Sequence, residues 1–205
     1  MSSIDATKGS QNVVWHPHSV DSHVRSTLFQ QRPVTLWLTG LSGAGKSTLG
    51  FALEHALIAA GHAGFVLDGD NVRHGLNRDL GFSAEDRQEN IRRIAEVARL
   101  MNAAGLIVIA SFISPYREDR QAAREIIGAD NFREIHVSTS LSACEQRDVK
   151  GLYRKAREGL IAEFTGISSP YEAPLSPDLS LDTAVLSIDQ AVAQMLELIK
   201  DRLVV

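Results

Sequence analysis

Residues 40–47 read GLSGAGKS, which fits the pattern G-x-x-x-x-G-K-[ST] of a phosphate-binding loop, or P-loop. The segments on either side have the character that such a loop requires. Val34–Thr39 reads as a buried strand, and residues 47–60 place apolar side chains at helical spacing. A strand, a glycine-rich loop and a helix in this order predict that the chain binds a nucleoside triphosphate.

Each residue type in the loop has a physical task. Glycines let the backbone turn its N–H groups, together with the N-terminus of the following helix, toward a phosphate. Lys46 would neutralise β- and γ-phosphate oxygens, and the Ser47 hydroxyl would reach a Mg²⁺ ion. The residues predicted to bind ATP in this segment are Gly40, Leu41, Ser42, Gly43, Ala44, Gly45, Lys46, Ser47 and Thr48.

Length and composition favour one globular domain. The chain has 205 residues, of which 44% are hydrophobic and 22% are charged, enough for one substantial core. Residues 1–32 are polar and carry no sustained periodicity. We therefore expect a flexible N-terminal arm at 1–32 and a single P-loop domain at 33–205.

The net charge and the number of cysteines indicate the cellular compartment and the class of partner of the protein. The single cysteine, Cys144, excludes an internal disulfide framework and fits a reducing compartment. No apolar run approaches the roughly 20 residues needed to span a bilayer. The net charge of −4 argues against sequence-independent nucleic-acid binding. The sequence therefore predicts a cytoplasmic protein that acts on a small phosphorylated substrate, with no membrane or nucleic-acid partner.

Strand and helix patterns alternate along the chain. Beyond the P-loop helix, strands are expected at residues 64–67, 106–111, 132–137 and 184–187, and helices at 84–104, 116–127, 141–148, 152–158 and 188–203. This order predicts a three-layer α/β fold with a mostly parallel central sheet and helices on both faces. Ligands should then bind at the carboxyl ends of the strands.

An acidic pair follows the second expected strand. Asp68 and Asp70 flank Gly69, so both carboxylates point in similar directions on an extended segment. One of them could hold the water shell of a magnesium ion while the other accepts a proton from an incoming hydroxyl. We assign Asp68 to the metal and Asp70 to the proton, and the reverse assignment stays open.

Three absent motifs narrow the class of P-loop protein. The sequence has no Asn-Lys-x-Asp motif for guanine, no His-Arg-Asp loop of protein kinases, and Ser111 where the strand at 107–110 would usually be followed by an aspartate. Switch GTPases and protein kinases are therefore disfavoured relative to small-molecule kinases.

Several blocks downstream of the P-loop resemble the adenylylsulfate kinase family. They are DGDNVR at 68–73, LGFSAEDRQENIRR at 80–93, ISPYR at 113–117, DR at 119–120, CEQRDVKGLY at 144–153 and FTGI at 164–167. The resemblance extends over most of residues 12–183 and departs from the family pattern at 159–161 and 168–172. Many blocks in the same order are far more specific than the P-loop alone.

The resemblance implies transfer of the γ-phosphoryl group of ATP to the 3′-hydroxyl of adenylyl sulfate, within sulfate activation. It places Phe82 and Phe164 on the two faces of the acceptor adenine, although Phe164 could instead be a core residue beneath a lid. Arg73 and Arg87 can bind the phosphosulfate. Asn90 lies three residues after Arg87 on the same helix face and can bind a neutral part of the ligand.

The resemblance also brings Ile113, Ser114 and a basic segment to the site. Ile113 and Ser114 follow the central strand and would contact the acceptor. Ser114 matches a serine often described as a phosphoserine intermediate, but direct in-line transfer needs no such intermediate. Residues 147–157 look like a mobile lid, in which Lys150 would bind substrate and Arg147 the nucleotide.

Two other functions remain open on the sequence. One is another small-molecule P-loop kinase, acting on a nucleotide or a sugar. The other is a nucleotide sensor without catalysis, which the acceptor-side residues disfavour. We also expect a homodimer, and an association with ATP sulfurylase is left open.

Overall fold

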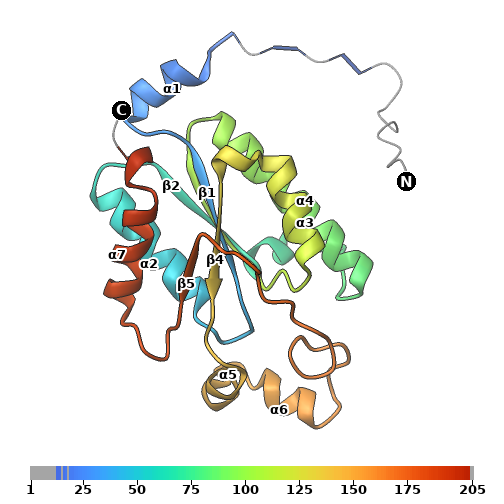
Figure 1. Ribbon diagram of the computed structural model, residues 1–205. Helices are drawn as coiled ribbons and strands as arrows, with labels where there is room; N and C mark the ends of the chain where they lie inside the picture. Colours follow the sequence, from blue (N-terminus) through green and yellow to red (C-terminus); the bar gives the residue numbers. More distant parts are fainter. Residues whose placement is uncertain (1–12, 15, 18, 204–205) are drawn as a thin grey trace.

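The computed structural model describes residues 13–14, 16–17 and 19–203, and its centre is a five-stranded parallel sheet in the order β2-β3-β1-β4-β5 (Figure 1). The strands are β1 (Val34–Thr39), β2 (Gly64–Asp68), β3 (Ile107–Ser111), β4 (Phe132–Val137) and β5 (Leu179–Leu181). All six residues of β1 are buried, as expected for a central strand covered on both faces. The parallel register places the ends of β1, β2, β3 and β4 at one edge.

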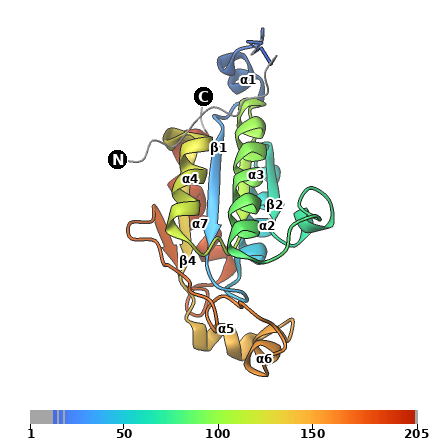
Figure 2. The same cartoon turned by 90° about the vertical axis from the view of Figure 1, so that its right-hand side faces the viewer.

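Helices cover both faces of the sheet. α2 (Lys46–Ala59) packs beside α7 (Ile188–Leu198) on one face, and α3 (Ala84–Ala103) beside α4 (Arg117–Ile127) on the other (Figure 2). Each face has its own apolar cluster, one around Leu53 and Ile109 and one around Trp37 and Ile94. The predicted three-layer α/β fold is confirmed.

Local sequence explains where several helices begin. The Ser83 side chain accepts the backbone N–H of Asp86 at the start of α3, and Ser187 forms a capping box with Gln190 at the start of α7. Short 3₁₀ turns at Asn71–His74, Ala129–Asn131 and Lys200–Arg202 complete the chain. No helix in the described part of the chain is long and apolar enough to cross a membrane.

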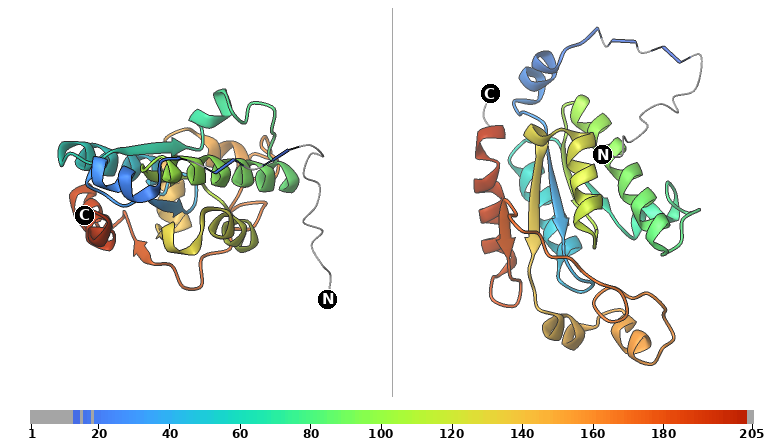
Figure 3. Two further views of the ribbon diagram at one scale, coloured as in Figure 1. Left: turned by 90° about the horizontal axis from the view of Figure 1, so that it is seen from above. Right: turned by 45° about the vertical axis from the view of Figure 1, so that its right-hand side comes forward.

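Two short helices lie beyond the carboxyl ends of the strands. α5 (Leu141–Arg147) follows β4, and α6 (Leu152–Arg157) follows a turn at 148–151 (Figure 3). The Asp148 carboxylate accepts the backbone N–H groups of Tyr153 and Arg154, which fixes the start of α6. The basic segment 147–157 therefore projects over the edge of the sheet where ligands are expected.

The last predicted strand is wrong. The sequence pattern predicts it at 184–187, but β5 spans Leu179–Leu181 and pairs with β4. Residues 182–186 form a turn, in which the Asp182 side chain accepts the N–H of Ala184 and its carbonyl accepts the N–H groups of Val185 and Leu186. Three residues are too few to give a periodic signal.

Part of the predicted N-terminal arm has regular structure. Helix α1 (Ser22–Phe29) begins after Asp21, whose side chain accepts the N–H of Val24. After it, the buried Gln31 side chain donates to the carbonyls of Ala63 and Gly105 and accepts the N–H of Ala63. Residues 19–32 are therefore attached to the domain, whereas most of 1–18 lies outside the described residues.

Candidate active site

A cleft of about 330 Å³ opens at the carboxyl edge of the sheet. That volume lies at the lower end of the range typical of small-molecule sites. Its lining combines the P-loop, the ends of β2 and β3, the start of α3 and the turn before α6. The predicted site residues that line it are Ser42, Gly43, Gly45, Lys46, Ser47, Thr48, Asp68, Asp70, Arg73, Phe82, Arg87, Asn90, Ile113, Ser114 and Lys150.

The P-loop has the backbone shape of an anion cradle. Gly43 and Gly45 have φ of 73° and 104°, in the left-handed region that favours glycine. At Gly40 a Cβ would lie 2.5 Å from the carbonyl oxygen of Val137, so only glycine fits against β4. The loop leads into α2, whose free N–H groups point toward the cleft. The glycine conformations thus have the form expected of a phosphate-binding loop.

Lys46 lies at the base of the cradle and is 8% exposed. Its ammonium donates to the carbonyls of Gly40 and Leu41, each at 2.8 Å. Burial is the main cause that lowers the pKa of Lys46 from 10.5 to about 8, although nearby carboxylates such as Asp68 partly oppose it. The site therefore holds a desolvated cation that an added anion would stabilise.

Asp68 and Asp70 occupy different environments at the end of β2. Asp68 is 7% exposed, and its Oδ2 accepts the Ser47 hydroxyl at 2.7 Å while Oδ1 accepts the backbone N–H of Asp70 at 3.0 Å. Asp70 is exposed to the cleft and forms an ion pair with Lys150. The buried carboxylate beside a serine hydroxyl suits a metal shell, and the exposed one can reach a substrate hydroxyl.

The described residues contain no group of three or more His, Cys, Asp or Glu side chains able to enclose a metal ion. Mg²⁺ is commonly bound by one or two protein ligands together with waters and substrate phosphates. Ser47 and Asp68 therefore fit a magnesium ion that arrives with a nucleotide.

An aromatic side chain and two arginines form the other end of the cleft. Phe82 is 60% exposed, with the Arg73 and Arg87 guanidinium groups 4.4 and 5.7 Å from its ring centre. Arg73 donates to the carbonyls of Leu80 and Gly81. An exposed ring beside two cations is suited to an anionic ligand that carries a flat base.

The floor of this end is polar. Asn90 is buried in α3 and accepts the side-chain N–H of Asn77 at 2.9 Å. Ser114 is also buried, and its Oγ accepts the indole N–H of Trp37 at 3.1 Å and donates to the Phe112 carbonyl at 3.4 Å. The Ser114 hydroxyl is thus held by neighbours, and within the described residues no carboxylate or imidazole is hydrogen-bonded to it, which favours a binding role over a covalent one.

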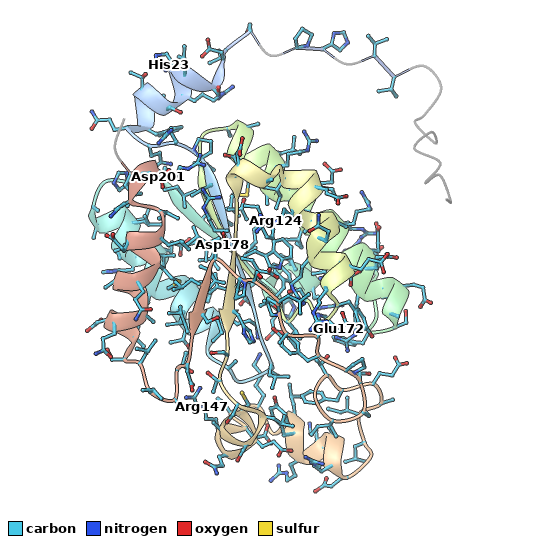
Figure 4. All side chains as sticks on the ribbon, in the orientation of Figure 1. His23, Arg124, Arg147, Glu172, Asp178 and Asp201 are labelled. Carbon is cyan, nitrogen blue, oxygen red and sulfur yellow. The ribbon has the colours of Figure 1, made fainter. Side chains whose placement is uncertain are left out.

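Arg147 does not line the cleft. Its guanidinium donates to the Gly43 carbonyl at 3.3 Å and to the hydroxyl and carbonyl oxygens of Thr183 at 2.7 and 2.8 Å. Figure 4 shows it at α5, at the lower end of the molecule. In this arrangement Arg147 supports the loop from outside, because Thr183 offers it two acceptors that the sequence pattern did not reveal.

Phe164 does not line the cleft either. It is 9% exposed and packs edge to face on Tyr153, with ring centres 5.0 Å apart, in the core beneath α6. The structure therefore favours the core alternative for Phe164. Its neighbour Thr165 does approach the site, since its Oγ1 accepts from Arg87 at 3.3 Å.

Sequence reasoning missed several residues that shape the site. The Tyr153 hydroxyl donates to the Ser42 carbonyl at 2.8 Å, and the Thr139 and Thr183 hydroxyls donate to the Ala44 carbonyl at 3.2 and 2.8 Å. Trp37 and Arg120 hold Ser114 from below. Only Tyr153 and Arg120 lay within the resembling blocks, and nothing in the sequence marked Thr183.

Several other arginines form ion pairs on the surface, away from the cleft. Arg92 and Arg93 pair with Glu89 on the surface of α3, Arg99 pairs with Glu96, and Arg157 pairs with Glu145. The free Cys144 is buried against the P-loop, as expected for a structural residue. These residues have no place in the cleft.

Known proteins match this chain over most of its length. The family model for adenylylsulphate kinase matches residues 32–182. Adenylyl-sulfate kinases of Vibrio cholerae serotype O1 and Shewanella sp. (strain MR-4) are 58% and 63% identical, covering 94% and 84% of this chain and 89% and 84% of theirs. A structure of the Mycobacterium tuberculosis APS kinase CysC in complex with AMPPNP and APS has a TM-score of 0.80 and 48% identity, covering 83% of this chain and 99% of that one. The chain therefore belongs to the adenylylsulphate kinase family.

Proposed function

We propose that the protein transfers the γ-phosphoryl group of ATP to the 3′-hydroxyl of adenylyl sulfate, giving 3′-phosphoadenylyl sulfate and ADP. The observation that supports this most is that a triphosphate cradle and an aromatic, arginine-lined end share one cleft, with Asp68 and Asp70 in its lining. The related M. tuberculosis protein was solved with AMPPNP and APS, a pair of ligands of these two kinds.

The phosphate end supplies positive charge without reorganising. Lys46 and the P-loop N–H groups stabilise the charge that develops on the transferred group. Ser47 and Asp68 would hold Mg²⁺, which when bound neutralises phosphate oxygens. Because Lys46 is already desolvated, its attraction for these oxygens is stronger than it would be in water.

The acceptor end positions the hydroxyl. Phe82 offers a face for the adenine, and Arg73 and Arg87 offer donors for the phosphosulfate. Asp70, exposed to the same cleft, accepts the hydroxyl proton as the oxygen attacks phosphorus. Lys150 would leave Asp70 for the phosphates as residues 147–157 close over the site and exclude water.

The proposal is tested by measuring ATP-dependent phosphorylation with adenylyl sulfate as the acceptor. AMP and gluconate serve as matched acceptors for the other kinase hypotheses. Turnover with adenylyl sulfate alone supports the proposal, whereas faster turnover with AMP or gluconate contradicts it. Nucleotide binding without turnover of any acceptor would favour a sensor.

The two phenylalanines should respond differently to alanine. Phe82→Ala is expected to raise the KM for adenylyl sulfate by about tenfold, because one stacked base contributes roughly 1–3 kcal/mol, with melting temperature unchanged. Phe164→Ala is expected to lower the melting temperature clearly, because burying a phenylalanine contributes about 3–5 kcal/mol over alanine. Acceptor kinetics and thermal unfolding of both variants check this. A stable Phe164→Ala protein with only acceptor binding impaired would restore Phe164 to the base-stacking role.

Nucleotide binding should take up a proton at alkaline pH. With the pKa of Lys46 at about 8, most of the free protein carries a neutral lysine at pH 9, and bound phosphates raise that pKa again. AMPPNP affinity is therefore expected to fall by up to about tenfold per pH unit above 8, and below pH 7, where Lys46 is charged in both the free and the bound protein, its titration should no longer make the affinity depend on pH. Calorimetry in buffers of different ionisation enthalpy measures the uptake, expected near one proton at pH 9. Lys46→Arg, which stays charged, is the control, and equal uptake in both proteins would contradict the assignment.

We further propose that the protein is a cytoplasmic homodimer. Val24 and Leu28 lie one turn apart on α1 and are 55% and 74% exposed, which gives α1 an apolar face that a second copy could cover. The lone buried Cys144 suits a reducing compartment. Light scattering of the protein tests the dimer. Association with ATP sulfurylase, whose product would be this substrate, stays a proposal to be tested by co-sedimentation.

A further inference from the structure

Ser114 has a backbone conformation that its sequence opposes. Its φ is +40°, in the left-handed region that residues other than glycine rarely adopt. It also precedes Pro115, and a residue before proline prefers extended backbone. A strained residue in the lining of a cleft persists only where its surroundings hold it in place.

The group that holds it is the guanidinium of Arg120. This side chain is 3% exposed and extends from the first turns of α4. Its Nη1 donates to the Ser114 carbonyl at 2.7 Å, its Nη2 to the Glu172 carbonyl at 2.8 Å, and its Nε to Glu134 Oε1 at 2.6 Å. The three acceptors belong to segments that lie apart in the sequence. Because the guanidinium group is planar and its N–H donors have fixed directions, it holds these acceptors at fixed relative positions.

Two further contacts complete the support. The Thr39 hydroxyl donates to the Ile113 carbonyl at 2.7 Å and is 3.0 Å from the Tyr171 hydroxyl. The Trp37 indole donates to Ser114 Oγ. Tyr171 and Glu172 belong to the loop between α6 and β5, and Figure 4 shows Glu172 near the start of α4. Arg120 and Thr39 thus join residues 113–114 to this loop from beneath.

We propose that Arg120 is a positioning residue for acceptor binding, which fixes the strained Ile113–Ser114 segment in the cleft and ties it to the loop at Tyr171 and Glu172. The proposal deepens the proposed function and rests on it. Arg120 itself does not line the cleft, so it acts through Ser114 and not on the ligand. Loss of its fork should therefore weaken acceptor binding and leave the nucleotide end unaffected.

The competing explanation is that Arg120 only stabilises the fold through its ion pair with Glu134. Glu134 is 15% exposed at the side chain, so the pair is largely buried. The two explanations separate in a matched pair of variants, Arg120→Gln and Glu134→Gln. Both break the ion pair and should lower the melting temperature, but only Arg120→Gln removes the donors to Ser114 and Glu172.

Steady-state kinetics with adenylyl sulfate and ATP decide between them. Arg120→Gln is expected to raise the KM for adenylyl sulfate by about tenfold or more, with the KM for ATP within about twofold, because each lost bond involves a charged donor. Glu134→Gln is expected to leave both KM values within about twofold. Equal changes in both variants, or an unchanged acceptor KM in Arg120→Gln, would overturn the proposal.

Two additional measurements keep the proposal testable if Arg120→Gln does not fold or if the protein does not phosphorylate adenylyl sulfate. Thr39→Val removes the hydroxyl that donates to the Ile113 carbonyl and should raise the KM for adenylyl sulfate by about threefold. An unchanged KM in Thr39→Val would count against the proposal. Trp15→Phe leaves Trp37 as the only tryptophan, so its emission reports the Ser114 contact without any substrate. An emission spectrum that is altered by Arg120→Gln but not by Glu134→Gln supports the positioning role, whether or not the wild-type protein phosphorylates adenylyl sulfate. A wild-type protein that fails to phosphorylate adenylyl sulfate would contradict the proposed function alone.

Discussion

Alanine in place of Lys46 is expected to lower kcat for adenylyl sulfate phosphorylation by about 10²-fold or more, because the lost charge acts mainly on the transition state. The fold should survive. Lys46 is buried, and desolvation lowers its pKa. Its ammonium donates to the carbonyls of Gly40 and Leu41, so the substitution loses these two hydrogen bonds but also removes the desolvation cost of a buried charge. Thermal unfolding should change by no more than a few degrees.

Lys200→Ala is the matched control for this variant, since it removes an exposed lysine from the 3₁₀ turn Lys200–Arg202, which does not line the cleft. Its kcat should stay within about twofold of wild type, as is usual for a solvated surface charge. Initial-rate kinetics and circular dichroism on the three proteins measure both effects. An unchanged kcat in Lys46→Ala would remove the P-loop from the mechanism.

Asparagine in place of Asp70 should abolish most turnover while ATP affinity is kept. The substitution keeps size and hydrogen bonding but removes the proton acceptor, for which a loss of about 10²–10⁴-fold is typical. Stability should hardly change, because Asp70 is exposed and its partner Lys150 is a solvated cation.

Asp68→Asn is the matched comparison at the other carboxylate. Asp68 is fixed by the Ser47 hydroxyl and the Asp70 N–H, so its loss should weaken metal binding, and high Mg²⁺ should restore part of the activity. Rates measured against Mg²⁺ concentration separate the two roles. Rescue of Asp70→Asn but not of Asp68→Asn would reverse the assignment, and full activity in both would exclude the pair.

Two strands, Val34–Thr39 and Phe132–Val137, were predicted with the bounds that the structure gives. All six residues of β1 are buried, which gives a strong local signal in a parallel sheet, whereas in β4 only Phe132, Ile135 and Val137 are buried. The assignments of the P-loop to phosphate and of Asp68 to a metal ion stay predictions, which rest on the specific residue types and fixed spacing that phosphate and metal chemistry demand. Resemblance to the family then supplied the acceptor end, including Arg73, Phe82 and Ser114, which no spacing argument could have reached.

The structure departs from the sequence-based expectation where the direction of a side chain depends on distant residues. Arg147 turns away from the cleft because Thr183, far along the chain, offers it two acceptors. Phe164 packs inward because Tyr153 supplies a ring at the right distance. The strand β5 was misplaced for a related reason, since its three residues are defined by pairing with β4 and not by their own pattern.

The sheet order carries a consequence for how the chain is made. β1 pairs with β3 and β4 and not with β2. During synthesis β1 therefore stays unpaired until β3, its first partner along the chain, is made about 70 residues later. At about 5–20 residues per second this leaves an unpaired apolar strand exposed on the ribosome for roughly 4–14 s. The outer support of the nucleotide loop comes later still, because Thr183 is synthesised 139 residues after Ala44. A nascent chain that has not yet reached Thr183 therefore lacks this hydrogen bond to the Ala44 carbonyl of the P-loop.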